Sequence, residues 1–228
     1  MVFRSNKAVE PFANRHAAGR LLGNALLPHL AHVPPENQIV LGLARGGVAV
    51  AVEVALILNV PLDACVVRKI GSPMQPELAI GAVAPGGVRI FNQGLIAEIG
   101  LSRKTVDRIG AEVERERSRL ESHLRAARPL PDLEDKYVVL VDDGLATGAT
   151  MHAALEYASD SAESVIVAVP TASPDVIRDF EALGVLTISL IAPRNFRSVG
   201  LWYDRFEEVT SEDVISLLAE AAQGENVE

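Results

Sequence analysis

Short runs of Val, Ile and Leu alternate along this chain with segments of helical pattern, and no other feature restricts the fold as much. The apolar runs span residues 39–43, 62–67, 137–141, 164–169 and 185–190. Because these runs are almost continuously apolar, each is expected to form a strand that is buried on both faces of a sheet. Helices are expected between the strands over residues 48–58, 149–158 and 174–183. The alternation predicts an α/β fold with a doubly wound, mostly parallel sheet and right-handed crossovers.

Two segments interrupt this alternation. Residues 79–90 are expected to form a β-hairpin, because Pro85, Gly86 and Gly87 supply a turn between two alternating runs. Residues 102–125 are expected to form a charged amphipathic helix with a solvated face. Its apolar residues fall near one side: Val106, Ile109, Val113, Leu120 and Leu124. Two more helices are expected, one over residues 15–30 and one after the N-capping Thr210.

Length and composition fit one domain with a sizeable core, since the chain has 228 residues of which 49% are hydrophobic. We expect a single domain over residues 1–228, with an insertion at 79–130 and a C-terminal hood loop and helix at 194–228. The single cysteine, Cys65, lies in an apolar run, which predicts a core residue and excludes a disulfide framework. The N-terminal stretch has no apolar signal region and no stretch is long enough to span a membrane, which favours a soluble cytoplasmic protein.

The charge balance restricts the partners. Lys and Arg number 21 and Asp and Glu number 30, which gives a formal net charge of −9. A net-acidic surface disfavours general binding to nucleic acid or to anionic lipid. The basic residues of segment 102–125 do not change this expectation, because acids are interleaved with them. Any anionic ligand must therefore be bound by local groups.

The stretch VVLVDDGLATGATM, residues 138–151, predicts a phosphate site. A buried strand ends in two acids and enters a turn that opens a helix, and the N–H groups of such a turn bind phosphate. Four turn residues suit this role through hydroxyl donors or backbone freedom: Thr147, Thr150, Gly144 and Gly148. Asp142 and Asp143 would repel that phosphate, so they are expected to accept hydrogen bonds from hydroxyls such as a ribose diol. An ordinary strand-to-helix turn with Asp caps is the alternative.

Two common phosphate loops are excluded by their residues. Ala149 stands where a Walker loop requires Lys, and the first strand is followed by Gly42-Leu43-Ala44-Arg45-Gly46-Gly47 rather than a Rossmann fingerprint. The motif VVLVDDGLATGAT instead resembles the phosphoribosyl pyrophosphate (PRPP) motif of the type I phosphoribosyltransferase family. The resemblance implies a flavodoxin-like strand order with a small hairpin and helix hood. It also implies that the two acids bind the ribose 2′ and 3′ hydroxyls and that residues 146–150 hold the 5′-phosphate. The PRPP-binding residues so implied are Asp142, Asp143, Gly144, Ala146, Thr147, Gly148, Ala149 and Thr150.

One departure from the family pattern concerns the acceptor. The 6-oxopurine salvage enzymes of the family carry a purine-facing Asp in this loop, and this chain has Ala146. The resemblance therefore gives no support to hypoxanthine or guanine as the acceptor.

A second loop, GLARGGV at residues 42–48, follows the first strand. Its glycine pair lets the backbone approach an anion, and Arg45 is a forked, permanently charged donor. The resemblance implies that Ala44, Arg45, Gly46 and Gly47 meet the pyrophosphate. A common turn with a surface Arg45 is the alternative. In a doubly wound sheet this loop and the Asp-Asp loop should face one crevice.

Two later segments complete the candidate site. Residues 68–82 are expected to form a mobile loop in which Arg68 and Lys69 neutralise pyrophosphate; a solvated Glu77 is favoured over a proton acceptor. Residues 194–206 hold four of the ten aromatic side chains, and Phe196 or Trp202 could stack on a planar acceptor. Core packing is an equal alternative for both aromatic residues. The five histidines show no metal-ligand spacing with one another.

These features predict a Mg²⁺-dependent transfer of ribose 5-phosphate from PRPP to a nitrogen acceptor, with release of pyrophosphate. The catalytic residues expected are Asp142, Asp143, Arg45 and Lys69, with the two acids contacting Mg²⁺ through water. The alternative is a regulatory protein of the same fold that senses PRPP or a nucleotide without turnover. A hydrolase using the same phosphate loop lacks a nucleophile or a His pair. The family suggests a homodimer.

Overall fold

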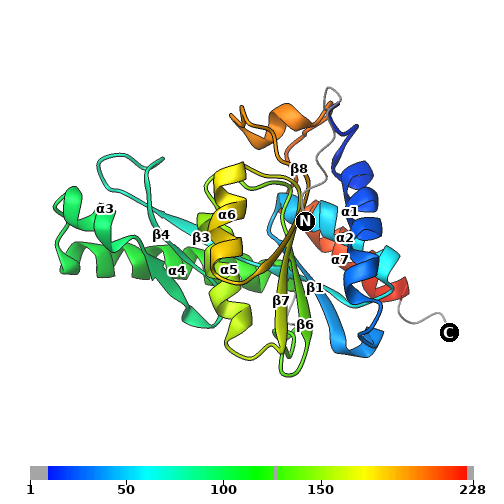
Figure 1. Ribbon diagram of the computed structural model, residues 1–228. Helices are drawn as coiled ribbons and strands as arrows, with labels where there is room; N and C mark the ends of the chain where they lie inside the picture. Colours follow the sequence, from blue (N-terminus) through cyan, green and yellow to red (C-terminus); the bar gives the residue numbers. More distant parts are fainter. Residues whose placement is uncertain (1–9, 126–127, 225–228) are drawn as a thin grey trace.

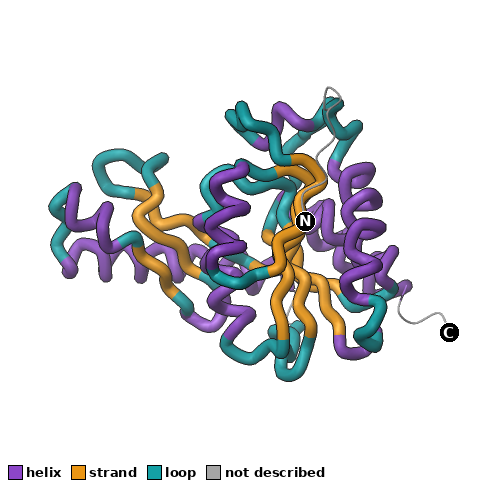
Figure 2. Tube along the Cα trace, viewed as in Figure 1, coloured by secondary structure: helices purple, strands orange, loops and turns teal. Residues whose placement is uncertain are grey.

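The computed structural model describes residues 10–125 and 128–224 and contains a five-stranded parallel sheet in the order β2-β1-β6-β7-β8 (Figures 1 and 2). Its strands are β1 (Gln38–Leu43), β2 (Leu62–Cys65), β6 (Tyr137–Val141), β7 (Ser164–Thr171) and β8 (Leu186–Ile191). The chain passes from β1 outward to β2 and later returns to the other side of β1, which places the topological switch between β1 and β6. The predicted doubly wound sheet with a flavodoxin-like order is confirmed.

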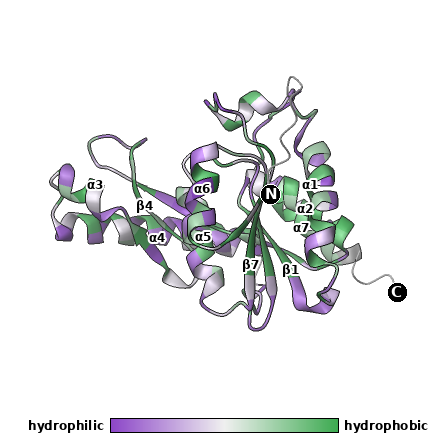
Figure 3. Cartoon of the chain, in the orientation of Figure 1, coloured by the Kyte–Doolittle hydropathy of each residue, from purple (hydrophilic) through white to green (hydrophobic). Residues whose placement is uncertain are grey.

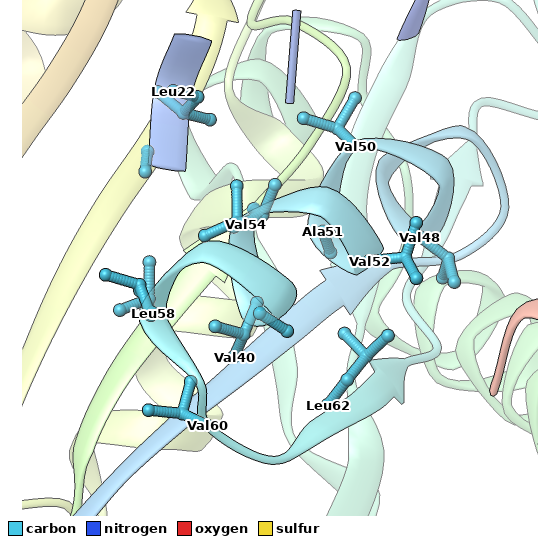
Figure 4. Packing of buried hydrophobic residues seen from close by; sticks show 14 of the residues in the cluster. Leu22, Val40, Val48, Val50, Ala51, Val52, Val54, Leu58, Val60 and Leu62 are labelled. Carbon is cyan, nitrogen blue, oxygen red and sulfur yellow. The ribbon is translucent and has the colours of Figure 1, made fainter. Parts of the chain in front are cut away.

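Helices cover both faces of this sheet. On one face lie α1 (Arg15–Leu30), α2 (Gly46–Leu58) and α7 (Ser211–Gly224); on the other lie α5 (Ala149–Ser159) and α6 (Pro174–Ala182) (Figure 1). Successive residues of β1 alternate between the two cores: Val40 packs with α1 and α2 residues (Figure 4), whereas Ile39 and Leu41 pack with α5 and α6 residues. Burial on both faces explains why most residues of these strands are hydrophobic (Figure 3).

A second, antiparallel sheet projects beside the first (Figure 1). It consists of β3 (Arg68–Gly71), β4 (Ala79–Val83) and β5 (Arg89–Phe91), and it packs with α3 (Gln93–Glu98) and α4 (Arg103–Arg125). We call residues 68–125 the arm. The predicted hairpin is confirmed as β4 and β5, joined through the turn η2 (Pro85–Gly87). The expectation of a mobile loop over residues 68–82 is wrong at its start. Arg68 and Lys69 form strand β3 and pair with Val83 and Ala82.

Helix α4 is confirmed in position but is less solvated than its charge pattern predicts. Arg117 is buried between Glu114 and Glu121 on its own helix. Arg125 is also buried, where its Nη1 donates to Asp63 Oδ2 of β2 at 2.8 Å and its Nη2 donates to the Ala64 carbonyl at 3.1 Å. The end of α4 packs against β2. Buried arginines are tolerated in this helix because each is paired with at least one carboxylate.

The chain ends and the remaining short elements close the fold. Two 3₁₀ turns, η1 (Pro35–Asn37) and η3 (Val199–Trp202), precede β1 and follow β8. The predicted N-cap of α7 is confirmed, because Thr210 and Asp213 exchange hydrogen bonds.

Cys65 is a buried free thiol, as expected. Among the described residues no helix is long and apolar enough to cross a membrane. The division into one domain with inserted segments stays a prediction, and residues 1–9, 126–127 and 225–228 of it lie outside the described residues.

Candidate functional site

The loops that follow β1 and β6 lie against each other at the carboxyl ends of these strands. Gly42 pairs with Val141, so the two neighbouring strands end at the same level. A Cβ on Gly47 would lie 2.7 Å from the Val141 carbonyl oxygen, and a Cβ on Gly46 would overlap the Asp143 carboxylate. Only glycine allows this approach. The structure therefore brings together Gly46, Gly47 and the two acids, at the switch point of the sheet.

The two acids share a partly buried position. Asp142 Oδ1 accepts a hydrogen bond from the Asp143 N–H at 2.8 Å. Burial and the charge of Asp143 raise the pKa of Asp142 well above its ordinary value, opposed by that hydrogen bond and by Arg15 and Lys69. Burial also raises the pKa of Asp143, and the Arg15 guanidinium opposes this shift. Only the ionised carboxylates are strong acceptors for hydroxyl groups, and the nearby positive charges of Arg15 and Lys69 favour that ionised form at Asp142.

Arg15 and Tyr203 contact Asp143 and were not found from the sequence. Arg15 Nε and Nη2 lie 2.9 and 2.8 Å from Asp143 Oδ2, and the Tyr203 hydroxyl donates to the Asp143 carbonyl at 2.6 Å. Arg15 begins α1, although a cation in the first turn of a helix is disfavoured by the helix dipole. That misplaced charge is the signal in the sequence that could have indicated a partner for Arg15.

The loop between Asp143 and α5 has the backbone form of an anion site. Its base is fixed to β7, since the Leu145 N–H donates to the Thr171 carbonyl at 2.9 Å. Gly148 has φ +72°, the left-handed conformation that favours glycine, and it precedes the first turn of α5. Ala146 and Thr147 are exposed, whereas Ala149 and Thr150 are partly buried. The loop presents its backbone at a helix N-terminus beside the acids.

The three basic residues expected to bind pyrophosphate lie on two different segments: Lys69 and Arg68 on β3, and Arg45 in the loop after β1. Lys69 is exposed on β3, and its charge opposes the rise in the pKa of Asp142. Arg68 is exposed on the same strand. Arg45 Nη2 forms an ion pair with Glu208 Oε1 at 2.7 Å, and the peptide bond joining Ala44 to Arg45 is cis. Glu77 is exposed in the loop between β3 and β4.

The aromatic residues of the C-terminal segment mostly pack on one another. Trp202 packs with the cluster of Phe12 and Tyr203, and Phe206 stacks on Tyr203 with ring centroids 5.0 Å apart. Phe196 is partly buried. The packing of Trp202 agrees with the alternative left open by the sequence, and acceptor binding by Phe196 or Trp202 stays a prediction. His152 stacks on Phe180, and burial lowers its pKa.

The donor set at the acids is one that suits Mg²⁺. Mg²⁺ usually keeps several waters and binds through one or two carboxylates plus substrate phosphates. Asp142 and Asp143 supply that pair, and the described residues contain no cluster of three or more acidic, His or Cys ligands that would form a complete protein site. Two carboxylates alone suit a Mg²⁺ ion whose other ligands are water and the phosphate groups of a bound substrate.

A cavity of about 520 Å³ extends from this site between the arm and α5. Its wall includes Gly81 and Phe91 of the arm and His152 and Leu155 of α5, and it reaches Thr147. The loop before α5 therefore borders an open volume large enough for a small molecule.

Comparison with known proteins gives matches over most of the chain. Residues 14–179 match the family described as "Phosphoribosyl transferase domain". Two proteins of Mycobacterium tuberculosis, provisionally named phosphoribosyl transferases, are each 37% identical over 211 residues. These alignments cover 92% of this chain and 47% of each relative, so the chain spans about half the length of the curated relatives that it matches. The crystal structure of the protein TT1426 from Thermus thermophilus is similar at 39% identity and a TM-score of 0.78, covering 92% of this chain and 98% of that chain.

Proposed function

Because this chain belongs to the phosphoribosyl transferase family, we propose that it transfers ribose 5-phosphate from PRPP to a nitrogen acceptor. The observation that carries the proposal is the contact between the Gly46–Gly47 loop and the acids Asp142 and Asp143. This contact places a backbone whose N–H groups can bind pyrophosphate beside carboxylates that can accept hydrogen bonds from ribose hydroxyls. Both lie at the crevice where α/β sheets bind ligands.

The residues have separate tasks in the proposed reaction. The bond between ribose C1 and the pyrophosphate oxygen breaks, pyrophosphate leaves with the electron pair, and the acceptor nitrogen bonds to C1 and loses its proton. Positive charge develops on the ribose, as in glycoside chemistry, and Asp142 and Asp143 stabilise it while they hold the 2′ and 3′ hydroxyls. Arg45 from the loop after β1 and Lys69 from β3 offset the charge of the leaving pyrophosphate, and Arg68, next to Lys69 in the chain, adds positive charge near them. The N–H groups of residues 146–150 hold the 5′-phosphate.

Asp142 and Asp143 would hold Mg²⁺ through water in this scheme. When bound with PRPP, the ion supplies positive charge that offsets the phosphate charges. The chain's own contribution is to keep the two carboxylates beside the pyrophosphate loop, which the contact at Gly46 enforces.

Release of pyrophosphate from PRPP tests the proposal. The full chain is mixed with PRPP and a panel of purine and pyrimidine bases, with and without Mg²⁺, and pyrophosphate is measured. We expect release that requires one acceptor and Mg²⁺. The double change Asp142→Asn and Asp143→Asn should abolish both turnover and PRPP binding.

A matched control keeps this test interpretable. Asp160→Asn removes an exposed carboxyl at the opposite end of α5 and should leave turnover unchanged. Circular dichroism and thermal melting establish that each variant is folded. PRPP binding that depends on the acids but gives no turnover with any acceptor would favour a PRPP-sensing protein. Absence of PRPP binding would contradict the proposed function altogether.

A further inference from the structure

Residues 202–208, which we call the strap, cross the carboxyl ends of β1 and β6 beside the N-terminal segment. The Phe12 N–H donates to the Trp202 carbonyl at 2.8 Å, and the Asp204 N–H donates to the Phe12 carbonyl at 2.8 Å. The strap is therefore a hydrogen-bonded part of the fold. Figure 1 shows the orange segment that follows β8 at the same end of the sheet as the start of α1.

The strap is anchored at the Asp143 side of the site. Its Tyr203 donates to the Asp143 carbonyl, and Arg15 Nη1 donates to the Glu207 carbonyl at 2.7 Å. The Arg15 guanidinium also lies 3.8 Å over the ring of Phe206. Because Arg15 is paired with Asp143 as well, the strap is fixed relative to the acids up to residue 207.

The next residue reaches the other half of the site. Glu208 Oε1 lies 2.7 Å from Arg45 Nη2, and 73% of the Glu208 side chain and 39% of the Arg45 side chain are exposed. Arg45 follows β1 in the loop to which the proposed function assigns pyrophosphate. The Glu208 carboxylate thus occupies an Arg45 N–H donor that the leaving pyrophosphate would otherwise use.

We propose that Glu208 competes with pyrophosphate for Arg45 and so sets how tightly the site holds the pyrophosphate group. This inference rests on the proposed function, because it requires pyrophosphate to bind at Arg45. Pyrophosphate carries several negative charges, and Glu208 is held one residue beyond the anchored Glu207 carbonyl, so its carboxylate and the incoming group repel each other. Glu208 therefore lowers the affinity of the site for pyrophosphate and for PRPP, and it favours product release by pairing again with Arg45.

The size of the effect follows from the exposure of the pair. Exposed ion pairs are weak, so removing the Glu208 charge should change affinity by about twofold to fivefold. Glu208→Gln should tighten binding of pyrophosphate and PRPP by this factor and should strengthen inhibition by the pyrophosphate product. Ribose 5-phosphate has no pyrophosphate group, so its affinity should stay constant.

Titration calorimetry of the full chain with pyrophosphate, PRPP and ribose 5-phosphate in Mg²⁺ buffer tests the proposal. Glu207→Gln is the matched control, because it removes the same charge one residue earlier, and it should change pyrophosphate affinity far less than Glu208→Gln. Arg45→Gln should weaken pyrophosphate binding, and in that background Glu208→Gln should have no further effect.

The outcomes separate this inference from the function on which it rests. Wild-type binding of pyrophosphate with unchanged or weaker binding by Glu208→Gln would overturn the competition alone. A gain that persists without Arg45, or that extends equally to ribose 5-phosphate, would also overturn it. If the wild type binds neither PRPP nor pyrophosphate, both the competition and the proposed function are wrong.

Discussion

Arg15 shows at the scale of one residue how the fold maintains a charged site. It pairs with Asp143, donates to the Glu207 carbonyl and lies on Phe206, so it joins the acids to the strap. We predict that Arg15→Gln lowers the free energy of unfolding by about 2 kcal/mol and weakens PRPP binding, because it leaves Asp143 without its cation. Urea unfolding and PRPP titration measure the two effects.

Arg20→Gln is the control for this prediction. Arg20 lies on the same helix and pairs with Glu53 at 3.3 Å, with 55% of its side chain exposed. Its loss should cost less than about 1 kcal/mol and leave PRPP binding unchanged. Equal effects of the two substitutions would show that Arg15 has no special role at the site.

The buried acids predict a pH-dependent cost in stability. Folding raises the pKa of Asp142 above its ordinary value of 3.8, chiefly through burial. Such a carboxyl stabilises the fold while protonated, and that stability is lost as the pH rises through the raised pKa. Asp142→Asn should therefore be more stable than the wild type by about 1–2 kcal/mol at pH 8, with little difference at pH 3.5.

Urea unfolding of the wild type and Asp142→Asn at both pH values measures this dependence. Asp160→Asn, at the far end of α5, shows whether any gain belongs to the buried pair. A difference between wild type and Asp142→Asn that is constant with pH would contradict the prediction.

At the scale of elements, the sequence predicts those whose pattern is local. The parallel strands and their helices follow from apolar runs that fill both faces of a sheet, and the β4–β5 hairpin follows from its turn residues. Strand β3 could not be predicted in this way, because Arg-Lys-Ile-Gly has no apolar run and becomes a strand only by pairing with β4. Helix α3 has six residues, too few for a periodic pattern.

The loop between Asp143 and α5, proposed to hold phosphate, contains Gly148 in the left-handed conformation. Gly148→Ala places a side chain at φ +72° and a Cβ 2.8 Å from Val176 Cγ1, so it should destabilise the fold by about 1–3 kcal/mol and weaken PRPP binding. Thermal melting and PRPP titration measure both effects. Gly94→Ala in α3 is the control, since its Cβ meets only Asn92 Oδ1 at 3.6 Å, and it should be neutral or stabilising. Equal PRPP affinity for both variants would contradict the role of the loop.

The end of α4 depends on one buried arginine. Arg125→Met removes the donors to Asp63 Oδ2 and to the Ala64 carbonyl and leaves the Asp63 charge without its cation, so we expect a loss of about 3–5 kcal/mol in the free energy of unfolding. Arg119→Met, at an exposed position of the same helix, should change it by less than about 0.5 kcal/mol. Urea unfolding distinguishes them, and a small effect at Arg125 would show that α4 does not need this contact.

At the scale of the whole molecule, the site combines segments that are far apart in the chain. The loops after β1 and β6 each carry a local motif, so their approach could be predicted from the rule for doubly wound sheets. Arg15 lies 128 residues from Asp143 and Tyr203 lies 60 residues from it, and neither has a motif of its own. Their contacts arise from tertiary packing, which a single sequence does not specify.

Cys65 tests whether the arm and the parallel sheet unfold as one unit. The thiol is buried at the end of β2, where burial raises its pKa to about 12, and the charges of Glu121 and Arg117 on α4 act on it. A buried protonated thiol does not react, so labelling requires opening of the structure around it. Arg125 clamps α4 to β2, and we therefore expect the urea midpoint for thiol labelling to coincide with that of circular dichroism. In Arg125→Met the labelling midpoint should fall below the circular dichroism midpoint, because the arm then opens first. Labelling of the wild type at urea concentrations where circular dichroism is unchanged would show that the arm already opens independently.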